Sequence, residues 1–309
     1  MNTFLVAGLL MATAGTAAAQ PPGDASVTTR TGHELQVSAG HYTYVEPGDL
    51  RISIHGARLG GEYTGTFSLN PRRHWFTTAN VRGNGGSLTY DGWCQPWLIR
   101  PSSTSPNGYT LGLGSASTCS ETGEADGYVE GRGLVGKDLL SRKWGVSPQT
   151  GVGLRYLSNA TSGVVNFRTD AYLYLPVRVT ARTLVSGRAL SLTAEYDVLL
   201  HGWQTTRESK LGGGDIPATP DAPAFTINGF TDLSFPQHDG WALRAGGKYQ
   251  VSRRWSVEPS FIHWNVGASP VREMTATFTV NGITARQQLG AYEPDNFTNE
   301  VTVSVGVHF

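Results

Sequence analysis

The sequence is short of three things: long apolar runs, net charge and cysteine. No stretch after the signal-like start approaches the roughly 20 apolar residues that a membrane-spanning helix needs. The 24 Lys and Arg residues balance the 24 Asp and Glu residues, so the chain has no general attraction for polyanions and we expect no nucleic-acid partner. The eight histidines show no close metal-ligand spacing with cysteine or carboxylate. We therefore expect no metal site and no cofactor.

The first residues have the pattern of a secretory signal. Residues 4–14 form an apolar run that is too short to cross a bilayer as a helix, and three alanines at 17–19 offer a small-residue cleavage site. We predict a signal peptide over residues 1–19 and a single mature domain over 20–309. The two cysteines, Cys94 and Cys119, lie in one polar segment. An exported protein folds in an oxidising compartment, so these cysteines are expected to form a disulfide.

The last residues of the chain alternate strictly between apolar and polar or small. One parity holds Val301, Val303, Val305, Val307 and Phe309. A period of two produces a strand with one apolar and one polar face. Only 39% of the residues are hydrophobic. A membrane protein with so little hydropathy has to be a β-barrel, because each strand faces lipid only with every second residue. A periplasmic β-sandwich also alternates, but it would not explain the aromatic end.

A terminal strand that ends on an aromatic residue resembles the closing strand of bacterial outer-membrane β-barrels. The resemblance implies a location in the bacterial outer membrane and contact with its lipid and lipopolysaccharide. It also implies that the barrel-assembly machinery recognises the strand ending at Phe309.

Alternation along the mature chain predicts ten strands, and hence an all-β fold: an antiparallel, up-and-down transmembrane β-barrel. The connections alternate between short and long, and in outer-membrane barrels the short turns are periplasmic. An even strand count would place both termini on that side. Long extracellular loops are expected at about 85–125, 201–239 and 266–297, the last with a hairpin turn at Asn281-Gly282. The expected strands are 33–45, 58–69, 73–84, 126–137, 147–158, 168–183, 188–200, 240–251, 254–265 and 298–309.

Charged residues of both signs fall on the inward parity of these strands in equal numbers. A barrel of about eight strands has an interior that side chains fill, whereas an open channel needs about sixteen strands. Buried charges must also be paired to be tolerable. We therefore predict a lumen plugged by an ion-pair network, with a narrow, charge-lined pore as the alternative. The predicted network contains Glu62, Arg82, Glu130, Arg132, Arg155, Arg178, Glu195, Asp197, Arg244, Lys248, Glu258 and Glu300.

Four segments occur in an order that resembles the omptin family of ten-stranded outer-membrane proteases. They are 83–86 (Gly-Asn-Gly-Gly), 90–93 (Tyr-Asp-Gly-Trp), 202–203 (Gly-Trp) and the strand–turn–strand 241–265. The second of them is similar to the omptin segment that carries an Asp-x-Asp pair ahead of a Trp. The order of the segments is similar along the whole mature chain, although each motif has low specificity.

Omptins activate water between an Asp pair and an Asp/His pair, which is general-base chemistry that needs close, convergent groups. The resemblance implies Asp91 as a candidate catalytic residue. The chain departs from the family because Asp91 stands alone, without a second Asp of the first pair. No Asp-x-His follows the Gly-Trp segment either, and the nearest His-Asp sequence is His238-Asp239, far along the same loop.

A shorter resemblance concerns residues 155–160, Arg-Tyr-Leu-Ser-Asn-Ala, which look like the His-x-Ser-Asn segment of outer-membrane lipid A deacylases. In those enzymes the His activates the Ser as a nucleophile against an acyl ester. The resemblance implies Ser158 as a nucleophile and Asp170 as an orienting acid. Tyr156 stands where the base of that motif is found. A Ser-Asn pair at a strand end is otherwise ordinary turn chemistry.

These observations predict an outer-membrane barrel with a plugged lumen and a structural or ligand-binding role carried by its extracellular loops. The alternatives are an outer-membrane hydrolase, either omptin-like or deacylase-like, and a small porin-like channel.

Overall fold

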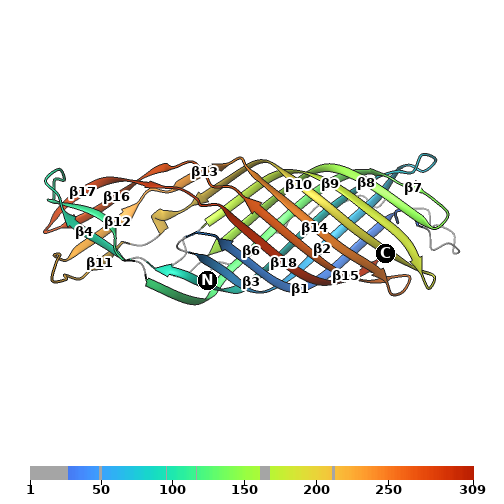
Figure 1. The fold of residues 1–309 in the computed structure, drawn as a ribbon, viewed down its shortest axis with the longest axis horizontal. Coiled ribbons are helices and arrows are strands. Elements are labelled where there is room, and N and C mark those ends of the chain that lie inside the picture. The colour runs from blue at the N-terminus through green and yellow to red at the C-terminus, as the bar shows by residue number, and fades with distance from the viewer. Residues whose placement is uncertain (1–26, 49–50, 95, 116, 161–167, 211–212) are drawn as a thin grey trace.

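The computed structural model describes residues 27–48, 51–94, 96–115, 117–160, 168–210 and 213–309. The predicted signal peptide lies outside these residues. Ten antiparallel strands form a closed ring (Figure 1), in which strand β9 joins β8 to β10 and strand β1 closes against β18. The predicted ten-stranded barrel is therefore confirmed. In ring order the strands are β1 (Gly32–Glu46), β2 (Ile52–Asn70), β3 (Trp75–Cys94), β6 (Ser117–Lys137), β8 (Trp144–Ala160), β9 (Arg168–Val185), β10 (Arg188–Thr206), β14 (Gly240–Gln250), β15 (Trp255–Val266) and β18 (Asn296–His308).

The outer wall of the barrel is apolar because successive side chains of a strand point to opposite faces. In β18, Val301, Val303 and Val305 are exposed, while the Thr and Ser residues between them are buried inside. Leu59 is 72% exposed and Val37 is 65% exposed. Apolar side chains this exposed in a continuous belt fit the hydrocarbon of a bilayer. In the described part of the chain, no helix is long and apolar enough to cross a membrane.

Several strands are longer than the alternation predicts, and β3 and β6 exceed their expected ranges the most. Strand β3 continues from the expected end at residue 84 to Cys94, and β6 begins at Ser117 rather than at 126. The two strands stay paired over this extension, up to Cys94 opposite Ser117. In β3 only Leu88 and Tyr90 alternate with polar residues after the glycine-rich segment 83–86, and residues 117–124 of β6 are mostly polar, so the sequence gives little sign of this continuation. The disulfide between Cys94 and Cys119 is confirmed and joins the two strands near their ends.

The long loops build a second, smaller β-structure at one end of the barrel (Figure 1). Four strands form a sheet in the order β11, β12, β16 and β17, and β4 pairs with β5 in a hairpin. The turn between β16 and β17 is the predicted Asn281-Gly282 turn, and both residues have positive φ, at 50° and 76°. The remaining elements are β4 (Trp97–Pro101), β5 (Tyr109–Leu113), β7 (Leu139–Leu140), η1 (Glu208–Lys210), β11 (Gly214–Ile216), β12 (Phe225–Phe230), β13 (Leu233–Gln237), β16 (Arg272–Val280) and β17 (Ile283–Ala291).

This loop structure has its own hydrophobic core, drawn from three separate loops. Phe225 and Phe278 from the four-stranded sheet pack with Ile99 from the β4–β5 hairpin in one buried cluster. The Gln287 side chain also accepts a hydrogen bond from the Leu111 amide at 2.7 Å and donates one to its carbonyl at 2.9 Å. We call residues 97–113, 214–237 and 272–291 the loop domain.

Glu208 in η1, next to strand β12 of the loop domain, gives this contact a pH dependence. Burial beside β12 raises the pKa of Glu208 to about 7, and Asp232 adds to the shift by repulsion. A carboxyl whose folded-state pKa is raised favours folding while it is neutral, so stability is lost as pH rises from about 4.5 through 7.

We expect opening of the segment around η1, measured by hydrogen exchange corrected for intrinsic rates, to become easier by about 1 kcal/mol between pH 5 and pH 8, a figure reduced for partial exposure to water. The Glu208→Gln variant should lose this dependence. A pH profile that Glu208→Gln leaves unchanged would assign the effect to another group.

Candidate functional site

The middle of the lumen is organised around Glu130 of β6, which is completely buried. Its carboxylate lies 2.9 Å from Arg82 Nη2, 3.0 Å from Arg244 Nη2 and 3.4 Å from Arg132 Nε. The Tyr174 hydroxyl donates a further hydrogen bond to it, at 2.5 Å. Because β6 and β14 are not neighbours in the ring, the Glu130–Arg244 contact crosses the lumen.

A second acidic centre lies on β10. Glu195 accepts a hydrogen bond from Arg132 Nη1 at 2.9 Å, lies 3.1 Å from Arg244 Nε, and also pairs with Arg178. Asp197, two residues on, accepts from Arg244 Nε at 2.6 Å. A buried charge is costly unless it is paired and hydrogen-bonded, and these contacts meet that condition. We call this set the central ion-pair layer: Arg82, Glu130, Arg132, Arg178, Glu195, Asp197 and Arg244.

On the side of the loop domain, arginines stack on aromatic rings. The Arg58 guanidinium carbon lies 3.3 Å from the centroid of the Tyr42 ring, and Arg58 pairs with Asp126 at 2.5 Å. The Arg155 guanidinium carbon lies 4.0 Å from the Tyr128 ring and 5.3 Å from the Trp264 ring. Such contacts gain strength when they are desolvated. We call Tyr42, Arg58, Tyr128, Arg155 and Trp264 the arginine–aromatic layer.

Strand parity correctly places Arg155 in the lumen but does not reveal its partner. Among the described residues, the ion pairs involve other cations, and Arg155 instead lies between two rings. The sequence offered no signal for this because Tyr128, Arg155 and Trp264 belong to different strands. Their proximity depends on the register and the closure of the ring.

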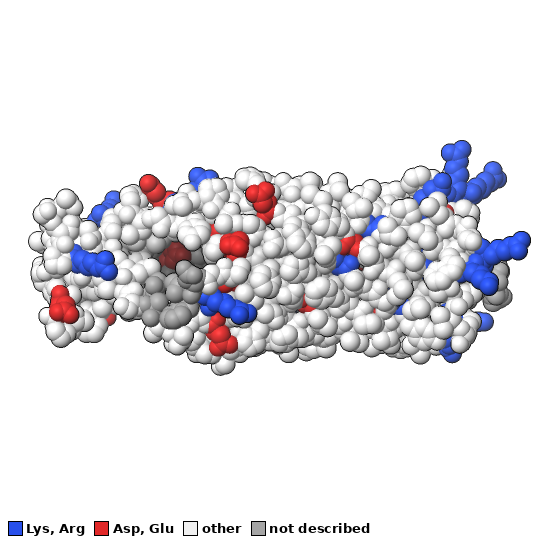
Figure 2. All heavy atoms as spheres, viewed as in Figure 1, with Lys and Arg blue, Asp and Glu red and all other residues white. Residues whose placement is uncertain are grey.

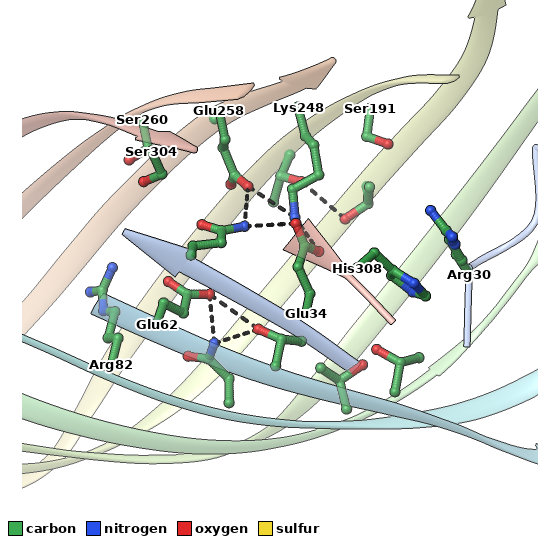
Figure 3. A pocket seen from close by; sticks show the side chains of 18 of the residues that line it. Arg30, Glu34, Glu62, Arg82, Ser191, Lys248, Glu258, Ser260, Ser304 and His308 are labelled. Carbon is green, nitrogen blue, oxygen red and sulfur yellow. Dashed lines mark hydrogen bonds and ion pairs between the residues drawn. The ribbon is translucent and has the colours of Figure 1, made fainter. Parts of the chain in front are cut away.

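From the short turns the lumen is open as a cavity of about 1050 Å³, which extends alongside the central ion-pair layer as far as Tyr128. It reaches the short turns, where Ser186, Gly187 and Arg253 line it, so it opens at that end of the barrel. Figure 3 shows Lys248 between two carboxylates, with Nζ 3.0 Å from both Glu34 Oε2 and Glu258 Oε2.

The two halves of the lumen differ because their side chains differ in size. The cavity wall is rich in small hydroxyl residues, such as Ser38, Thr193, Ser260 and Ser304, whereas large aromatic rings with arginines between them fill the other half. Glu62 and Glu300 also line the cavity. Asn80 donates a hydrogen bond to Glu62 at 2.6 Å, and Asn84 donates one to Glu300 at 2.9 Å. The predicted network therefore fills only part of the lumen.

The arginine–aromatic layer divides the interior into two spaces. Tyr128 lines the inner end of the cavity. Arg155 and Trp264 line a much smaller pocket on the far side, next to Tyr44 and Arg168. The side chains of Tyr128 and Arg155, in contact with each other, therefore form the partition.

The two residues implied by the deacylase resemblance do not meet. Ser158 shares the outward parity of Tyr156, which is 48% exposed. Asp170 lies opposite Leu157 in the register, points into the lumen and pairs with Arg168 at 3.3 Å. A carboxylate inside the barrel cannot orient a base beside a serine on its outer face.

The omptin candidate Asp91 and the nearest His-Asp sequence, His238-Asp239, form no ion pair with each other among the described residues. Asp91 is on β3, while His238 and Asp239 follow β13, which pairs with β10. The His238 ring lies tilted against the His201 ring, with ring centroids 5.5 Å apart. The histidine beside Asp91 is His55 of β2, at 3.6 Å, in a half-exposed pair that sequence reasoning missed.

No protein-family model matches this chain, and no curated protein matches its sequence. Among solved structures, it is similar to the outer-membrane protease OmpT from Escherichia coli, with a TM-score of 0.51 and 12% identity over 92% of this chain and 100% of that chain. An outer-membrane channel from Pseudomonas putida F1 matches with a TM-score of 0.37 and 11% identity, over 94% of this chain and 100% of that one.

The likeness to OmpT extends to the fold alone at this identity. Together with the closed ring, the apolar outer wall and the paired charges inside, it supports one description. The chain is an outer-membrane β-barrel of ten strands with a buried network of charged residues.

Proposed function

We propose that this protein is a non-conducting barrel that holds its loop domain as a rigid platform for binding an external ligand. One observation carries the proposal: three loops share a single hydrophobic core above a lumen that is filled on their side. Ordered loops of this length are usually functional. A binding surface that is already ordered loses less conformational entropy when a ligand binds.

The loop domain offers an apolar contact at the base of its β16–β17 hairpin. Val271 and Tyr292 flank the first residue pair of that hairpin, Arg272 opposite Ala291. Val271 is 66% exposed and Tyr292 is 58% exposed. Exposed apolar groups rimmed by polar residues are a common feature of binding sites.

To test the platform, the refolded full-length barrel in detergent micelles is applied to arrays of glycans and secreted proteins. We expect a reproducible ligand class whose binding falls about tenfold in Val271→Ser/Tyr292→Ser, the loss expected when one small hot spot is removed. The matched control is Leu139→Ser/Leu140→Ser, two exposed apolar residues at the opposite end. Binding that survives replacement of residues 271–292 by a short glycine turn would contradict the platform.

Removal of the disulfide should loosen the loop domain and leave the barrel intact. The bond closes a sequence separation of 25 residues that includes the β4–β5 hairpin. The chain-entropy account predicts a loss of about 3 kcal/mol for a loop of that size. In Cys94→Ser/Cys119→Ser, we expect protease cleavage between the two positions to accelerate, while the heat-induced gel shift of the barrel stays as in the wild type. Equal cleavage rates would show that the loop core holds the hairpin without the bond.

The cavity favours a second candidate function, a gated channel. A space of about 1050 Å³ already runs from the short turns to Tyr128. Displacement of the arginine–aromatic layer would be the gating step.

A further inference from the structure

The short-turn end of the barrel carries a concentration of exposed positive charge. Each of the four short turns between neighbouring ring strands has at least one exposed cation in it or directly beside it. Figure 2 shows Lys and Arg side chains projecting from that end of the molecule. We call the following set the basic rim: Arg72, Arg73, Arg142, Lys143, Arg188, Arg253 and Arg254.

These cations have no local acidic partners. Among the described residues, none of the rim side chains takes part in the ion pairs, which lie in the lumen and the loops. The one acidic residue in the four turns is Asp138, which is buried. It accepts hydrogen bonds from Thr29 and Ser147 and pairs with Arg182. The rim therefore presents uncompensated positive charge to whatever surrounds it.

Tryptophan residues fix the depth of the rim in the membrane. Strands β3, β8 and β15 begin at Trp75, Trp144 and Trp255, directly after the turns. Their exposed fractions are 39%, 50% and 52%. Exposed Trp on a membrane protein sits at the level of the lipid headgroups. The adjacent basic residues, Lys143 and Arg254 among them, therefore lie at the depth of the phosphates.

The opposite end of the barrel has no such bias. On the loop domain and its flanks, exposed Arg100, Arg272 and Arg286 are interspersed with exposed Asp221 and Glu273. In outer-membrane barrels the short turns face the periplasm, so the rim meets the phospholipid leaflet rather than lipopolysaccharide. Arginine matches the geometry of a phosphate with paired hydrogen bonds, and surface cations near an anionic leaflet are attracted to it.

We propose that the basic rim binds anionic phospholipid headgroups, with phosphatidylglycerol as the simplest case, in preference to zwitterionic phosphatidylethanolamine. The ammonium group of the zwitterion opposes the rim charge, whereas the anionic headgroup has no such group. This role is independent of the loop domain and goes beyond the platform function. It fixes the tilt and depth of the barrel from its periplasmic side.

The test uses the full chain reconstituted in liposomes of equimolar phosphatidylethanolamine and phosphatidylglycerol. Native mass spectrometry counts the lipids of each kind that stay attached. We expect phosphatidylglycerol to be retained about fivefold more often in the wild type at low salt, and the ratio to approach unity at high salt. The test variant is Arg73→Gln/Lys143→Gln/Arg254→Gln, which neutralises one cation beside each of the three tryptophans.

The matched control is Arg100→Gln/Arg272→Gln/Arg286→Gln, which removes the same charge from the other end. The proposal is supported if the preference disappears in the rim variant and persists in the control. It is overturned if both variants keep the preference, or if both lose it equally. It is also overturned if the rim variant keeps the lipid preference but stops co-sedimenting with purified peptidoglycan, which would make the cell wall the partner. A heat-induced gel shift confirms that each variant is folded.

Discussion

Replacing Glu130 with Ala should destabilise the barrel by about 3–5 kcal/mol, the cost of leaving buried charges without their partner. Glu130 contacts three arginines and the Tyr174 hydroxyl, and all of them lose an acceptor at once. The measurement is reversible unfolding in guanidinium chloride from a detergent or lipid host that supports refolding.

The control for this experiment is Glu62→Ala in the same lumen. Glu62 is half-buried at the cavity wall and accepts hydrogen bonds from Asn80 and Thr64 without taking part in an arginine pair. Its loss should cost about 1 kcal/mol, the usual value for a hydrogen bond. Equal destabilisation by the two substitutions would mean that the central ion-pair layer contributes no more to the free energy of unfolding than the cavity wall does.

The second large effect concerns ion conduction. In planar bilayers the wild-type protein should give no discrete conductance steps, because the arginine–aromatic layer closes the cavity at Tyr128. The variant Arg58→Ser/Tyr128→Ser/Arg155→Ser removes three large side chains from that layer and should give open steps. Asp126 and Glu300 would keep their charge without the two arginines, so the new path should select cations.

The control for conduction is Thr193→Ser, which removes one methyl group from the cavity wall below the partition. This variant should give no conductance steps. Stable steps from the wild-type protein would show that the lumen conducts as it stands, which favours the channel candidate over the platform. If the triple variant is folded but gives no conductance steps, the barrier to ions lies in the central ion-pair layer or under the loop domain.

Much of the fold follows from a single physical regularity. A strand that separates lipid from a polar interior must alternate, and this period locates all ten strands of the ring within a few residues along most of their length. The exceptions are instructive. Strands β3 and β6 extend beyond the membrane belt, and there the alternation is confined to Leu88 and Tyr90. Of the loop domain, the sequence predicted the turn at Asn281-Gly282 but not the shared core, which combines Ile99, Phe225 and Phe278 from three loops.

The sequence predicts which side chains point into the lumen, but not which of them contact one another. Parity places Arg155 and Glu130 inside, but which groups meet depends on side-chain size, register and closure. Arg244 contacts Glu130 across the lumen, and the half-exposed pair of His55 and Asp91 follows from register alone. The local motifs predicted least: Ser158 and Asp170 lie on opposite faces of the barrel wall, and Asp91 pairs with His55, a residue that no motif indicated.

The cross-lumen ion pairs have a consequence for assembly. Arg132 of β6 meets Glu195 of β10, and Glu130 of β6 meets Arg244 of β14, yet β6 is a ring neighbour of neither β10 nor β14. In an open, half-curled sheet these charges would be far apart and hydrated. They meet when the sheet curls into the ring, and the pairing of β18 with β1 also brings Glu300 to Asn84. We therefore expect closure of the barrel and dehydration of its interior to occur together, because buried charges are tolerable only when their partners are in place.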